Sequence, residues 1–283
     1  MQRIGVVANL SKPKAREVTM KLITCLESFG VEVMICADKA TALGYPEKGV
    51  SPKELATAEC VLVLGGDGTF LRAAHLVKNT GTPLLGINMG HLGFLTEVEL
   101  KDLRPAIEKL IAGDYQVRER MMLSASVKCP GSNSTYKALN DVVITKKNVS
   151  PLRLETYVCQ SYLDTYRADG LIIASPTGST AYSLSAGGPL VSPELQVMII
   201  TPICPHSLYA RPLVVSGEKE IKVKINDNNV MLTVDGQEEI DLDKGSIVTV
   251  TKDEIPTRII RLNSNFYDVV REKLREGRYR QDD

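Results

Sequence analysis

The sequence predicts an α/β domain, then a β-rich domain, then a last helix. Over residues 1–117, short apolar runs alternate with segments whose apolar residues recur at helical spacing. This alternation is typical of a mostly parallel, Rossmann-like sheet covered by helices on both faces. Over residues 118–262 several runs alternate with period two, as half-buried antiparallel strands do. Residues 263–283 return to helical spacing.

The first domain is predicted to open as strand, helix, strand. Short apolar runs place strands at residues 3–8, 31–36, 60–64 and 83–88. Helical spacing places helices at residues 13–29, 69–78 and 100–112, and a glycine follows each of them. Glycines and prolines mark residues 37–59 as a loop with a short helix near its end.

The second domain is predicted from its alternation of apolar and polar residues. The pattern is clearest at residues 123–129, 221–225 and 230–234. Asp235-Gly236 follows the last of these runs and is a typical hairpin turn. In the C-terminal segment, Phe266, Val269, Val270 and Leu274 fall on one face of a helix.

Composition excludes several classes of protein. The chain has 283 residues, 43% of them hydrophobic, which is enough for a buried core. Its 34 basic and 34 acidic side chains cancel, which argues against a nucleic-acid partner because that needs a basic face. No apolar run is long enough for a membrane span or a signal peptide. The six cysteines form no Cys-x-x-Cys pair, so we expect buried, reduced thiols and a cytoplasmic protein without a membrane partner.

Residues 64–71, Leu-Gly-Gly-Asp-Gly-Thr-Phe-Leu, form a predicted strand-to-helix turn. Its glycines would let the backbone approach a phosphate without Cβ atoms in the way. It is not the dinucleotide fingerprint, which needs a glycine at Leu71, and the ATP-binding loop Gly-x-x-x-x-Gly-Lys-[Ser/Thr] matches nowhere. Asp67 would repel an anion here unless it holds a metal ion or takes a proton from a reacting hydroxyl; otherwise it simply caps the helix.

Two further stretches are candidates for binding a nucleotide. Residues 167–189 are rich in small hydroxyl side chains and glycines and include Tyr182, so they could hydrogen-bond a ribose or phosphate and stack against a base. Asn140-Asp141 precedes an apolar run, and its amide and carboxylate could hold the two hydroxyls of one ribose. On local features alone, both stretches could equally be surface turns.

In their order and spacing, these motifs resemble the bacterial NAD kinases. The matching segments are residues 65–69 (Gly-Gly-Asp-Gly-Thr), 86–95 (Gly-Ile-Asn-Met-Gly-His-Leu-Gly-Phe-Leu), 140–143 (Asn-Asp-Val-Val), 169–189 (from Asp-Gly-Leu-Ile-Ile to Ala-Gly-Gly-Pro) and 205–213 (from Pro-His-Ser-Leu to Arg-Pro-Leu). Gly-Gly-Asp-Gly-Thr alone is shared with lipid kinases and, loosely, with phosphofructokinases. The long motif at 169–189 is far more specific.

The resemblance implies transfer of the terminal phosphate of ATP to the 2′-hydroxyl of the adenosine ribose of NAD, giving NADP. It implies that Asp67 is the general base for that hydroxyl. It also implies a sandwich-like second domain, a C-terminal helix packed on the first domain, and a homodimer or homotetramer. The residues that it places around the ligands are Gly66, Gly68, Arg72, Asn140, Asp141, Arg167, Asp169, Thr180, Ala181, Tyr182, Ser183, Leu184, Ser185 and Gln237.

One departure concerns the ribose motif. The family more often has Asn-Glu where this chain has Asn140-Asp141, so the carboxylate is kept with one methylene fewer, and we expect the ribose contact to survive. The sequence shows no carboxylate cluster that would form an all-protein metal cage. We therefore expect Mg²⁺, or another divalent cation, to enter with ATP and to be held largely by its phosphates and water. The sequence does not decide between ATP and polyphosphate as donor.

Two other functions remain open at this point. The chain could be a kinase of another hydroxyl substrate, a lipid or a sugar, that uses the same glycine turn. It could also be a dinucleotide-sensing protein that binds NAD or NADP without catalysis. The ribose-type motif and the lack of an exposed basic amphipathic helix disfavour the first, and the intact Asp67 disfavours the second.

Overall fold

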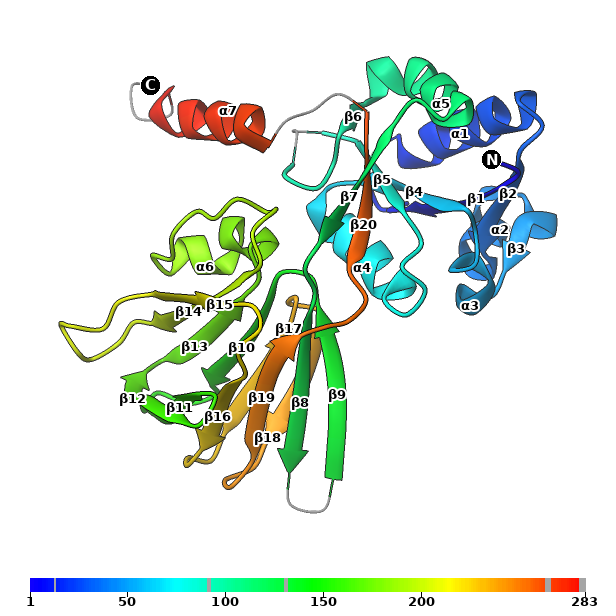
Figure 1. Cartoon of the computed structure of the whole chain (residues 1–283). Coiled ribbons are helices and arrows are strands. Elements are labelled where there is room, and N and C mark those ends of the chain that lie inside the picture. The colour runs from blue at the N-terminus through cyan, green and yellow to red at the C-terminus, as the bar shows by residue number, and fades with distance from the viewer. Residues whose placement is uncertain (13, 91–92, 130–131, 263–265, 280–283) are drawn as a thin grey trace. The chain divides into compact units, whose positions relative to one another are not determined.

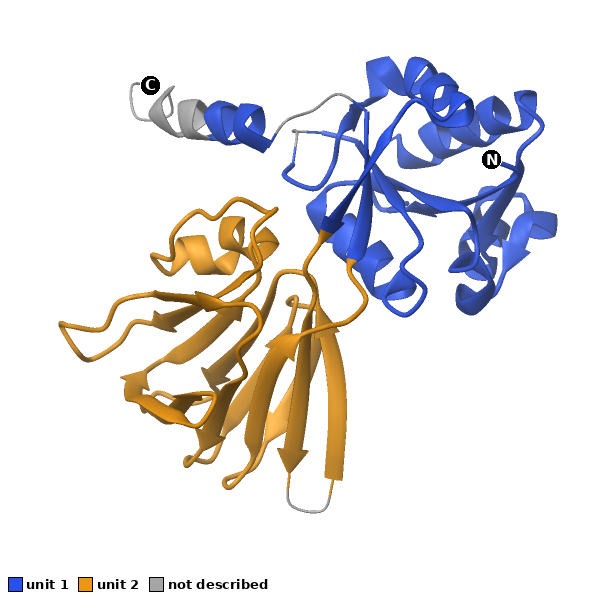
Figure 2. Ribbon diagram, in the orientation of Figure 1, with its two compact units in different colours: residues 1–119, 257–283 blue, residues 120–256 orange. Residues whose placement is uncertain are grey.

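A computed structural model describes the chain except residues 13, 91–92, 130–131, 263–265 and 280–283, and describes the backbone alone for residues 274–279. The chain divides into two compact units (Figure 2). Unit 1 comprises residues 1–119 and 257–283, and unit 2 comprises residues 120–256. Each unit has a hydrophobic core of its own.

Unit 1 is built on one eight-stranded sheet (Figure 1). Its strands are β1 (Arg3–Ala8), β2 (Glu32–Cys36), β3 (Gly49–Val50), β4 (Cys60–Gly65), β5 (Leu84–Asn88), β6 (Val98–Glu99), β7 (Gln116–Arg120) and β20 (Thr257–Arg261). They lie in the order β3-β2-β1-β4-β5-β20-β7, with β6 also paired to β5. The neighbours from β3 to β20 pair in parallel. The predicted mostly parallel α/β sheet is therefore confirmed.

Helices cover both faces of this sheet. They are α1 (Ala15–Ser28), α2 (Ala37–Leu43), α3 (Pro52–Leu55), α4 (Asp67–Val77) and α5 (Leu103–Ala112), with 3-10 turns at Pro46–Lys48 and Leu100–Asp102. Unit 1 also contains α7 (Phe266–Tyr279), which follows β20 in the sequence. Figure 1 shows α1 and α5 on one face and α4 on the other. β4 is buried along its whole length, as expected for a strand between two helical layers.

The first helices differ from prediction in their ends. Pro13, the predicted start of the first helix, lies outside the described residues. The helix expected from Thr69 begins at Asp67, because the Gly66 carbonyl already accepts the N–H groups of Thr69 and Phe70. Helix α2 falls in the segment expected to be a loop. Its seven residues are too few to show a periodic apolar stripe.

Unit 2 is a sandwich of two six-stranded antiparallel sheets (Figure 1). One sheet has the order β15-β14-β13-β10-β17-β18 and the other β12-β11-β16-β19-β8-β9. The strands are β8 (Leu123–Cys129), β9 (Ser132–Ala138), β10 (Asp141–Lys146), β11 (Leu152–Val158), β12 (Ser161–Ala168), β13 (Gly170–Ala174), β14 (Val197–Ile203), β15 (Leu213–Ser216), β16 (Ile221–Ile225), β17 (Val230–Val234), β18 (Glu238–Leu242) and β19 (Ile247–Lys252). Alternate residues of both sheets fill one core, so the predicted period-two, β-rich part is confirmed.

Two local features of the fold position the candidate site. Asp235 and Gly236 both have positive φ, 51° and 62°, and connect β17 to β18 as the predicted hairpin turn. A 3-10 turn (Thr177–Thr180) and the short helix α6 (Tyr182–Ser185) follow β13.

At the start of α7, the ring of Phe266 lies 6.2 Å from the ring of Phe94. The C-terminal helix thus contacts the loop that follows β5 in unit 1.

None of the described helices is long and apolar enough to cross a membrane.

All six cysteines are free thiols, but only Cys60 is fully buried, and Cys204 is exposed. Burial raises the pKa of Cys60 to about 12, so this thiol stays protonated. The expectation that all six thiols are buried is wrong, because four of them are only partly covered and Cys204 is exposed.

Candidate active site

The Gly-Gly-Asp-Gly-Thr turn lies at the carboxyl end of the sheet in unit 1. The strand order 3-2-1-4-5 reverses direction between β1 and β4, and in open α/β sheets ligands bind at the carboxyl ends beside such a reversal. β4 ends at Gly65, and Asp67 begins helix α4. The loop after β1 joins the turn there, since the N–H of Asn9 donates to the Leu64 carbonyl at 3.1 Å.

The glycines of the turn serve different purposes. A Cβ on Gly65 would lie 2.3 Å from the Thr69 hydroxyl, so only glycine fits there. The same hydroxyl accepts a hydrogen bond from the Arg72 guanidinium at 3.3 Å. Gly68 has open space around it, so its exposed backbone at the helix N-terminus is accessible to an anion.

The Asp67 carboxylate is oriented by the backbone of the loop after β5. The N–H groups of Phe94 and Leu95 donate to its two oxygens at 3.0 and 3.1 Å. Gly93 lies against the same carboxylate, because a Cβ there would come 2.1 Å from an Asp67 oxygen. His91 and Leu92, which belong to the family motif at residues 86–95, lie outside the described residues. Asp67 is therefore more than a helix cap, since a separate loop fixes its side chain.

Lys12 brings a positive charge to this turn. Its Nζ lies 3.6 Å from the position that a Gly66 Cβ would occupy. The sequence did not indicate Lys12, because it lies in the loop after β1 and belongs to no phosphate motif. A cation beside a glycine turn is suited to neutralising phosphate oxygens.

In unit 2, Asp235 organises the segment that carries Asn140 and Asp141. Its buried carboxylate accepts the N–H groups of Leu139, Asn140 and Asp141 at 2.8, 2.7 and 3.1 Å. Asp235 was predicted only as a turn residue, and its hairpin also carries Gln237, which is exposed. The hairpin turn and the start of β10 are thus brought together, as the predicted ligand contacts require.

Asp141 is buried beside this carboxylate. Burial, and to a lesser extent the negative charge of Asp235, raise the pKa of Asp141 to about 7. At neutral pH the Asp141 carboxyl is therefore present in both protonation states. In the neutral state it can donate a hydrogen bond to a hydroxyl group as well as accept one.

The turn after β13 packs directly on Asn140. The Ser175 N–H donates to the Asn140 carbonyl at 2.8 Å, and a Cβ on Gly178 would lie 2.1 Å from that carbonyl oxygen. Among the described residues, the hydroxyl of Thr177 is the buried side-chain polar atom without a hydrogen-bond partner. A buried unpaired hydroxyl is costly unless a ligand or water satisfies it. Thr177 is thus a candidate ligand contact that the sequence did not single out.

The predicted contacts at residues 180–185 differ in accessibility. Tyr182 is 45% exposed and Leu184 is 41% exposed. Ser183 is fully buried and shares a hydrogen bond of 3.0 Å with Thr201, so its side chain serves the packing of α6. The Thr180 hydroxyl donates to the Thr177 carbonyl at 3.1 Å. Ala181 and Ser185 lie in the same turn, where Ser185 is exposed.

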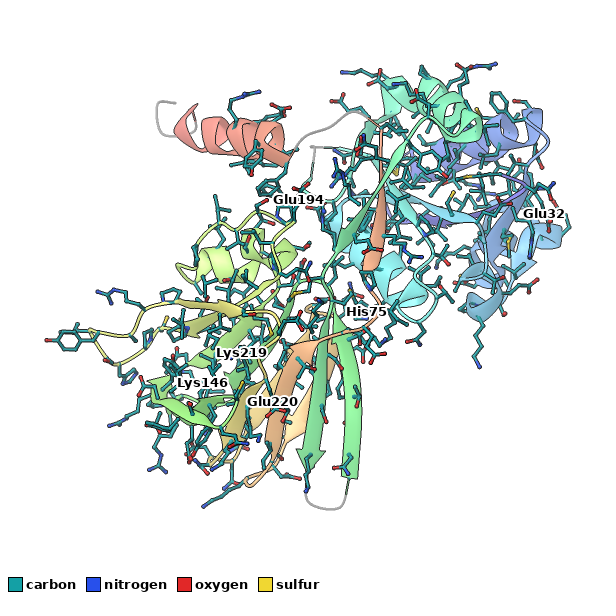
Figure 3. The ribbon with its side chains drawn as sticks, in the orientation of Figure 1. Glu32, His75, Lys146, Glu194, Lys219 and Glu220 are labelled. Atoms are coloured by element: carbon teal, nitrogen blue, oxygen red, sulfur yellow. The ribbon has the colours of Figure 1, made fainter. Side chains whose placement is uncertain are left out.

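Asp169 lies at the opposite end of the β10–β13 pair, and Arg167 lies two residues before it, on β12 of the other sheet. Asp141 is opposite Ala174 in the register of β10 and β13, whereas Asp169 precedes Gly170 at the other end. At about 3.4 Å per residue, the two ends are about 17 Å apart. Asp169 forms an ion pair of 2.6 Å with Lys146, which is labelled in Figure 3. The structure therefore does not bring Arg167 and Asp169 into one ribose-sized site with Asn140 and Asp141.

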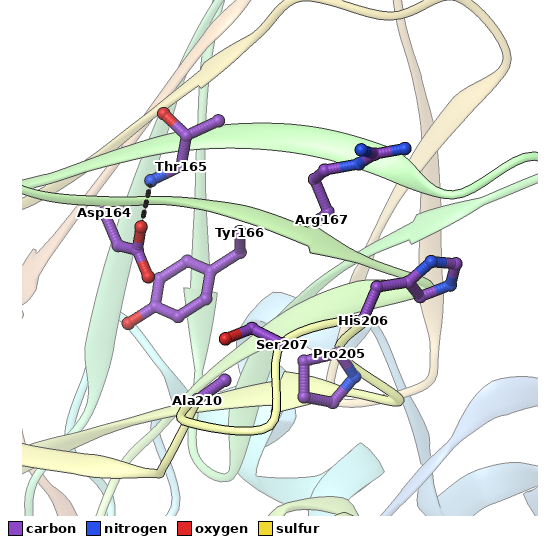
Figure 4. A pocket seen from close by; sticks show the side chains of 8 residues that line it. All are labelled: Asp164, Thr165, Tyr166, Arg167, Pro205, His206, Ser207 and Ala210. Carbon is purple, nitrogen blue, oxygen red and sulfur yellow. Dashed lines mark hydrogen bonds between the residues drawn. The ribbon is translucent and has the colours of Figure 1, made fainter.

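Arg167 lines a polar hollow of about 420 Å³ (Figure 4). The hollow lies between β12 and the loop that follows β14, and the His206 N–H donates to the Arg167 carbonyl at 2.8 Å. Its lining residues are Asp164, Thr165, Tyr166, Arg167, Pro205, His206, Ser207 and Ala210.

The described residues contain no group of three or more His, Cys, Asp or Glu side chains that could hold a metal ion. A divalent cation that enters with a nucleotide needs no such cage, because phosphates and water supply most of its ligands.

Comparison with known proteins identifies the family. Residues 4–115 match the model of the ATP-NAD kinase N-terminal domain, and residues 139–262 match that of the ATP-NAD kinase C-terminal domain. An NAD kinase of Moorella thermoacetica is 61% identical over 100% of this chain and 92% of its own length. The chain belongs to the NAD kinase family.

Other members of the NAD kinase family agree with this assignment. An NAD kinase of Caldanaerobacter subterraneus subsp. tengcongensis is 44% identical over 98% of this chain and 100% of its own. The crystal structure of yeast NADH kinase complexed with NADH has a TM-score of 0.89 and 28% identity, over 96% of this chain and 86% of that one. An NAD kinase from Archaeoglobus fulgidus in complex with ATP has a TM-score of 0.78 and 27% identity, over 95% and 97%. The resemblance read from the sequence is confirmed, and it favours an NAD kinase over a lipid or sugar kinase or a non-catalytic sensor.

The contact between Gly93 and Asp67 predicts the effect of one added methyl group. In Gly93→Ala, the new Cβ should displace the Asp67 carboxylate or the loop, and kcat should fall by about 100-fold. Gly90→Ala is the matched control, since its Cβ would meet nothing within 4 Å. Steady-state kinetics of both variants would check this, and equal kcat values in the two would contradict it.

The raised pKa of Asp141 predicts a pH-dependent stability difference. Between about pH 4 and pH 7 the carboxyl ionises in the unfolded chain but stays protonated in the folded one, so the wild type loses stability as pH rises through this window. Asp141→Asn does not titrate. Its unfolding free energy relative to wild type should therefore rise with pH, by up to about 1.4 kcal/mol per pH unit, and level off above pH 7. Denaturant unfolding at several pH values measures this, and a difference independent of pH would refute it.

Proposed function

We propose that the chain transfers the terminal phosphate of ATP to the 2′-hydroxyl of the adenosine ribose of NAD, with Asp67 as the general base. The chain is an NAD kinase, an enzyme that phosphorylates NAD to NADP with ATP. The observation that carries the proposed role of Asp67 is the orientation of its carboxylate by the N–H groups of Phe94 and Leu95. This carboxylate stands at the start of α4, where the sheet order predicts ligand binding.

The two backbone donors leave Asp67 able to act on a hydroxyl. Each carboxylate oxygen can accept about two hydrogen bonds, and each has one from the loop. The remaining acceptor positions can receive the proton of a ribose hydroxyl. In the proposed step, the 2′-oxygen forms a bond to the terminal phosphorus of ATP, the bond from that phosphorus to the bridging oxygen breaks, and ADP leaves with the bond's electron pair. The hydroxyl proton passes to Asp67.

The turn around Asp67 also supplies what the phosphates of ATP need. The backbone at Gly66 and Gly68 and the N-terminus of α4 favour negative charge. Lys12 lies against Gly66, and Arg72 lies one helical turn after Gly68. A divalent cation that enters with ATP, Mg²⁺ for example, would neutralise the charge that develops on the phosphate oxygens. The side chain of the buried Asn88 is hydrogen-bonded to the backbone of Gly90 in the loop after β5.

The second unit is proposed to hold the dinucleotide through one end of its sandwich. Asn140 and Asp141 would contact ribose hydroxyls, and the unpaired Thr177 hydroxyl would find its partner in the ligand. Gln237 lies on the hairpin held to the same segment by Asp235. The remaining contacts would come from residues 180–185, with the exposed Tyr182 ring against a base.

We also propose that the chain forms a homodimer or homotetramer. Arg167 and Asp169 match the family's ligand-binding motif, yet Asp169 lies about 17 Å along the sheet from Asp141, and Arg167 lies two residues before Asp169. If they contact NAD, a second copy of the chain would let them reach a site whose other residues come from its neighbour. The polar hollow beside Arg167 lies at this end of the sandwich.

Replacement of Asp67 tests the proposed base. Asp67→Asn keeps the shape but cannot take the proton, so kcat for NADP formation should fall by about 10² to 10⁴-fold while the Kd for NAD changes little. Asp38→Asn, another first-turn residue of a helix in unit 1, is the control and should keep wild-type turnover. Near-normal kcat in Asp67→Asn would remove Asp67 as the base.

Mixing two inactive variants tests the shared site. Asp67→Asn and Asp169→Ala should each be strongly impaired, and a mixture allowed to exchange subunits should regain activity. This follows because one site of the mixed oligomer then has both an intact Asp67 and an intact Asp169 from different chains. A mixture no more active than its components would place both residues in one chain's site, and full activity of Asp169→Ala alone would exclude Asp169 from any site.

A further inference from the structure

We propose that Arg261 and Glu97 are positioning residues for Asp67 and act on it through the loop after β5. This inference rests on the proposed role of Asp67 as general base. All the residues involved lie in unit 1 and are described by the structure. Neither Arg261 nor Glu97 belongs to the motifs that the sequence singled out.

Arg261 and Glu97 form a largely buried ion pair at the end of β20. The Arg261 Nη1 donates to Glu97 Oε2 at 3.1 Å, and the two side chains are only 13% and 4% exposed. The second Glu97 oxygen, Oε1, accepts the N–H of Leu262 at 2.6 Å. The second guanidinium nitrogen of Arg261, Nη2, donates to the carbonyl of Phe94 at 3.2 Å.

That carbonyl belongs to a peptide group that also touches Asp67. The peptide bond between Phe94 and Leu95 has its oxygen on Arg261 and its N–H on Asp67 Oδ1, at 3.2 and 3.1 Å. A cation at the carbonyl polarises the peptide and strengthens its N–H as a donor, because hydrogen bonds in a chain reinforce one another. Arg261 therefore fixes and strengthens one of the two donors that orient the Asp67 carboxylate.

The same loop is anchored to the sheet independently of Arg261. The Glu97 N–H donates to the Gly86 carbonyl at 2.9 Å, which attaches the loop to β5. Within the loop, the Gly93 N–H donates to the buried Thr96 hydroxyl at 3.1 Å. Loss of the Arg261 side chain would therefore free the peptide that holds Asp67 while the rest of the loop stays attached to β5.

The presence of an ion pair at this position, instead of an apolar contact, supports a positioning role for Arg261 and Glu97. A buried ion pair contributes little net stability, because desolvation of two charges offsets their attraction, and apolar replacements are often as stable. The pair fixes the direction of hydrogen bonds, which an apolar contact cannot do. The Phe94 ring has an apolar contact of its own with Phe266, so packing of the loop does not depend on Arg261 alone.

A double-mutant cycle between Arg261 and Asp67 tests the inference. Arg261→Met, Asp67→Asn and the double variant would be compared with wild type by kcat and by KM for NAD and ATP, with a sensitive assay of NADP formation. Arg258→Met is the matched control, since Arg258 lies on the same strand in an exposed ion pair with Glu119. Thermal melts of all variants report folding.

If Arg261 acts through Asp67, its replacement should lower kcat in the wild type but not in the Asp67→Asn variant. Arg261→Met should lower kcat by about 10 to 100-fold, with both KM values close to wild type, and should lower it no further on the Asp67→Asn background. Arg258→Met should keep wild-type kcat. Arg261→Lys should restore part of the loss, because one ammonium group can still donate to Glu97 or to the Phe94 carbonyl.

Other outcomes overturn the inference. An equal fold-loss of kcat on both backgrounds would show that Arg261 acts on the fold and not through Asp67, and wild-type kcat in Arg261→Met would show no role. If Arg261→Met does not fold, Glu97→Gln replaces it in the same cycle with the same criterion. Near-normal turnover of Asp67→Asn would instead refute the proposed base itself, so the two failures are distinguishable.

Discussion

The candidate site of unit 1 depends on one electrostatic arrangement. The carboxylate of Asp67 accepts backbone N–H groups at a helix N-terminus, a position that favours anions. Asp67 stands among glycines at the start of a helix, where a negative charge would otherwise repel phosphate. The N–H groups of Phe94 and Leu95 compensate part of this charge and fix its direction. This requirement accounts for the absence of a side chain at Gly93, for the placement of the loop after β5, and for the largely buried cation of Arg261 that contacts this loop.

In unit 2, a carboxylate also accepts backbone N–H groups, but there it fixes the position of a backbone segment. Asp235 gathers three consecutive N–H groups and thereby fixes the segment that presents Asn140 and Asp141. Its charge also contributes, after burial, to the raised pKa of Asp141, which is about 7. In both units a carboxylate supplied by a turn organises the backbone of another segment. The proposed chemistry differs because Asp67 lies at an accessible helix start, whereas Asp235 is buried.

Much of this could be predicted from the sequence, because it depends on local patterns. Apolar runs and periodicity predicted β1, β2, β4 and β5 of unit 1 and β8, β16 and β17 of unit 2. Asp235-Gly236 predicted the hairpin turn, since only certain residues adopt positive φ without strain. The partners of Asp67 could not be predicted, because they are backbone N–H groups about 27 residues away and carry no side-chain signature. The pairing of β20 with β5 and the approach of Lys12 to Gly66 are likewise long-range contacts. The separation of Asp169 from Asp141 became visible only when the register of β10 and β13 was known.

The central claim is that the oriented Asp67 carboxylate takes the proton of the 2′-hydroxyl. A crystal structure of the chain with NAD and a non-hydrolysable ATP analogue tests it most directly. The account predicts an Asp67 oxygen within about 2.6–3.2 Å of the 2′-oxygen of the adenosine ribose, with the N–H groups of Phe94 and Leu95 still bound to the carboxylate. A 2′-hydroxyl bonded to another residue and beyond the reach of Asp67 would contradict it.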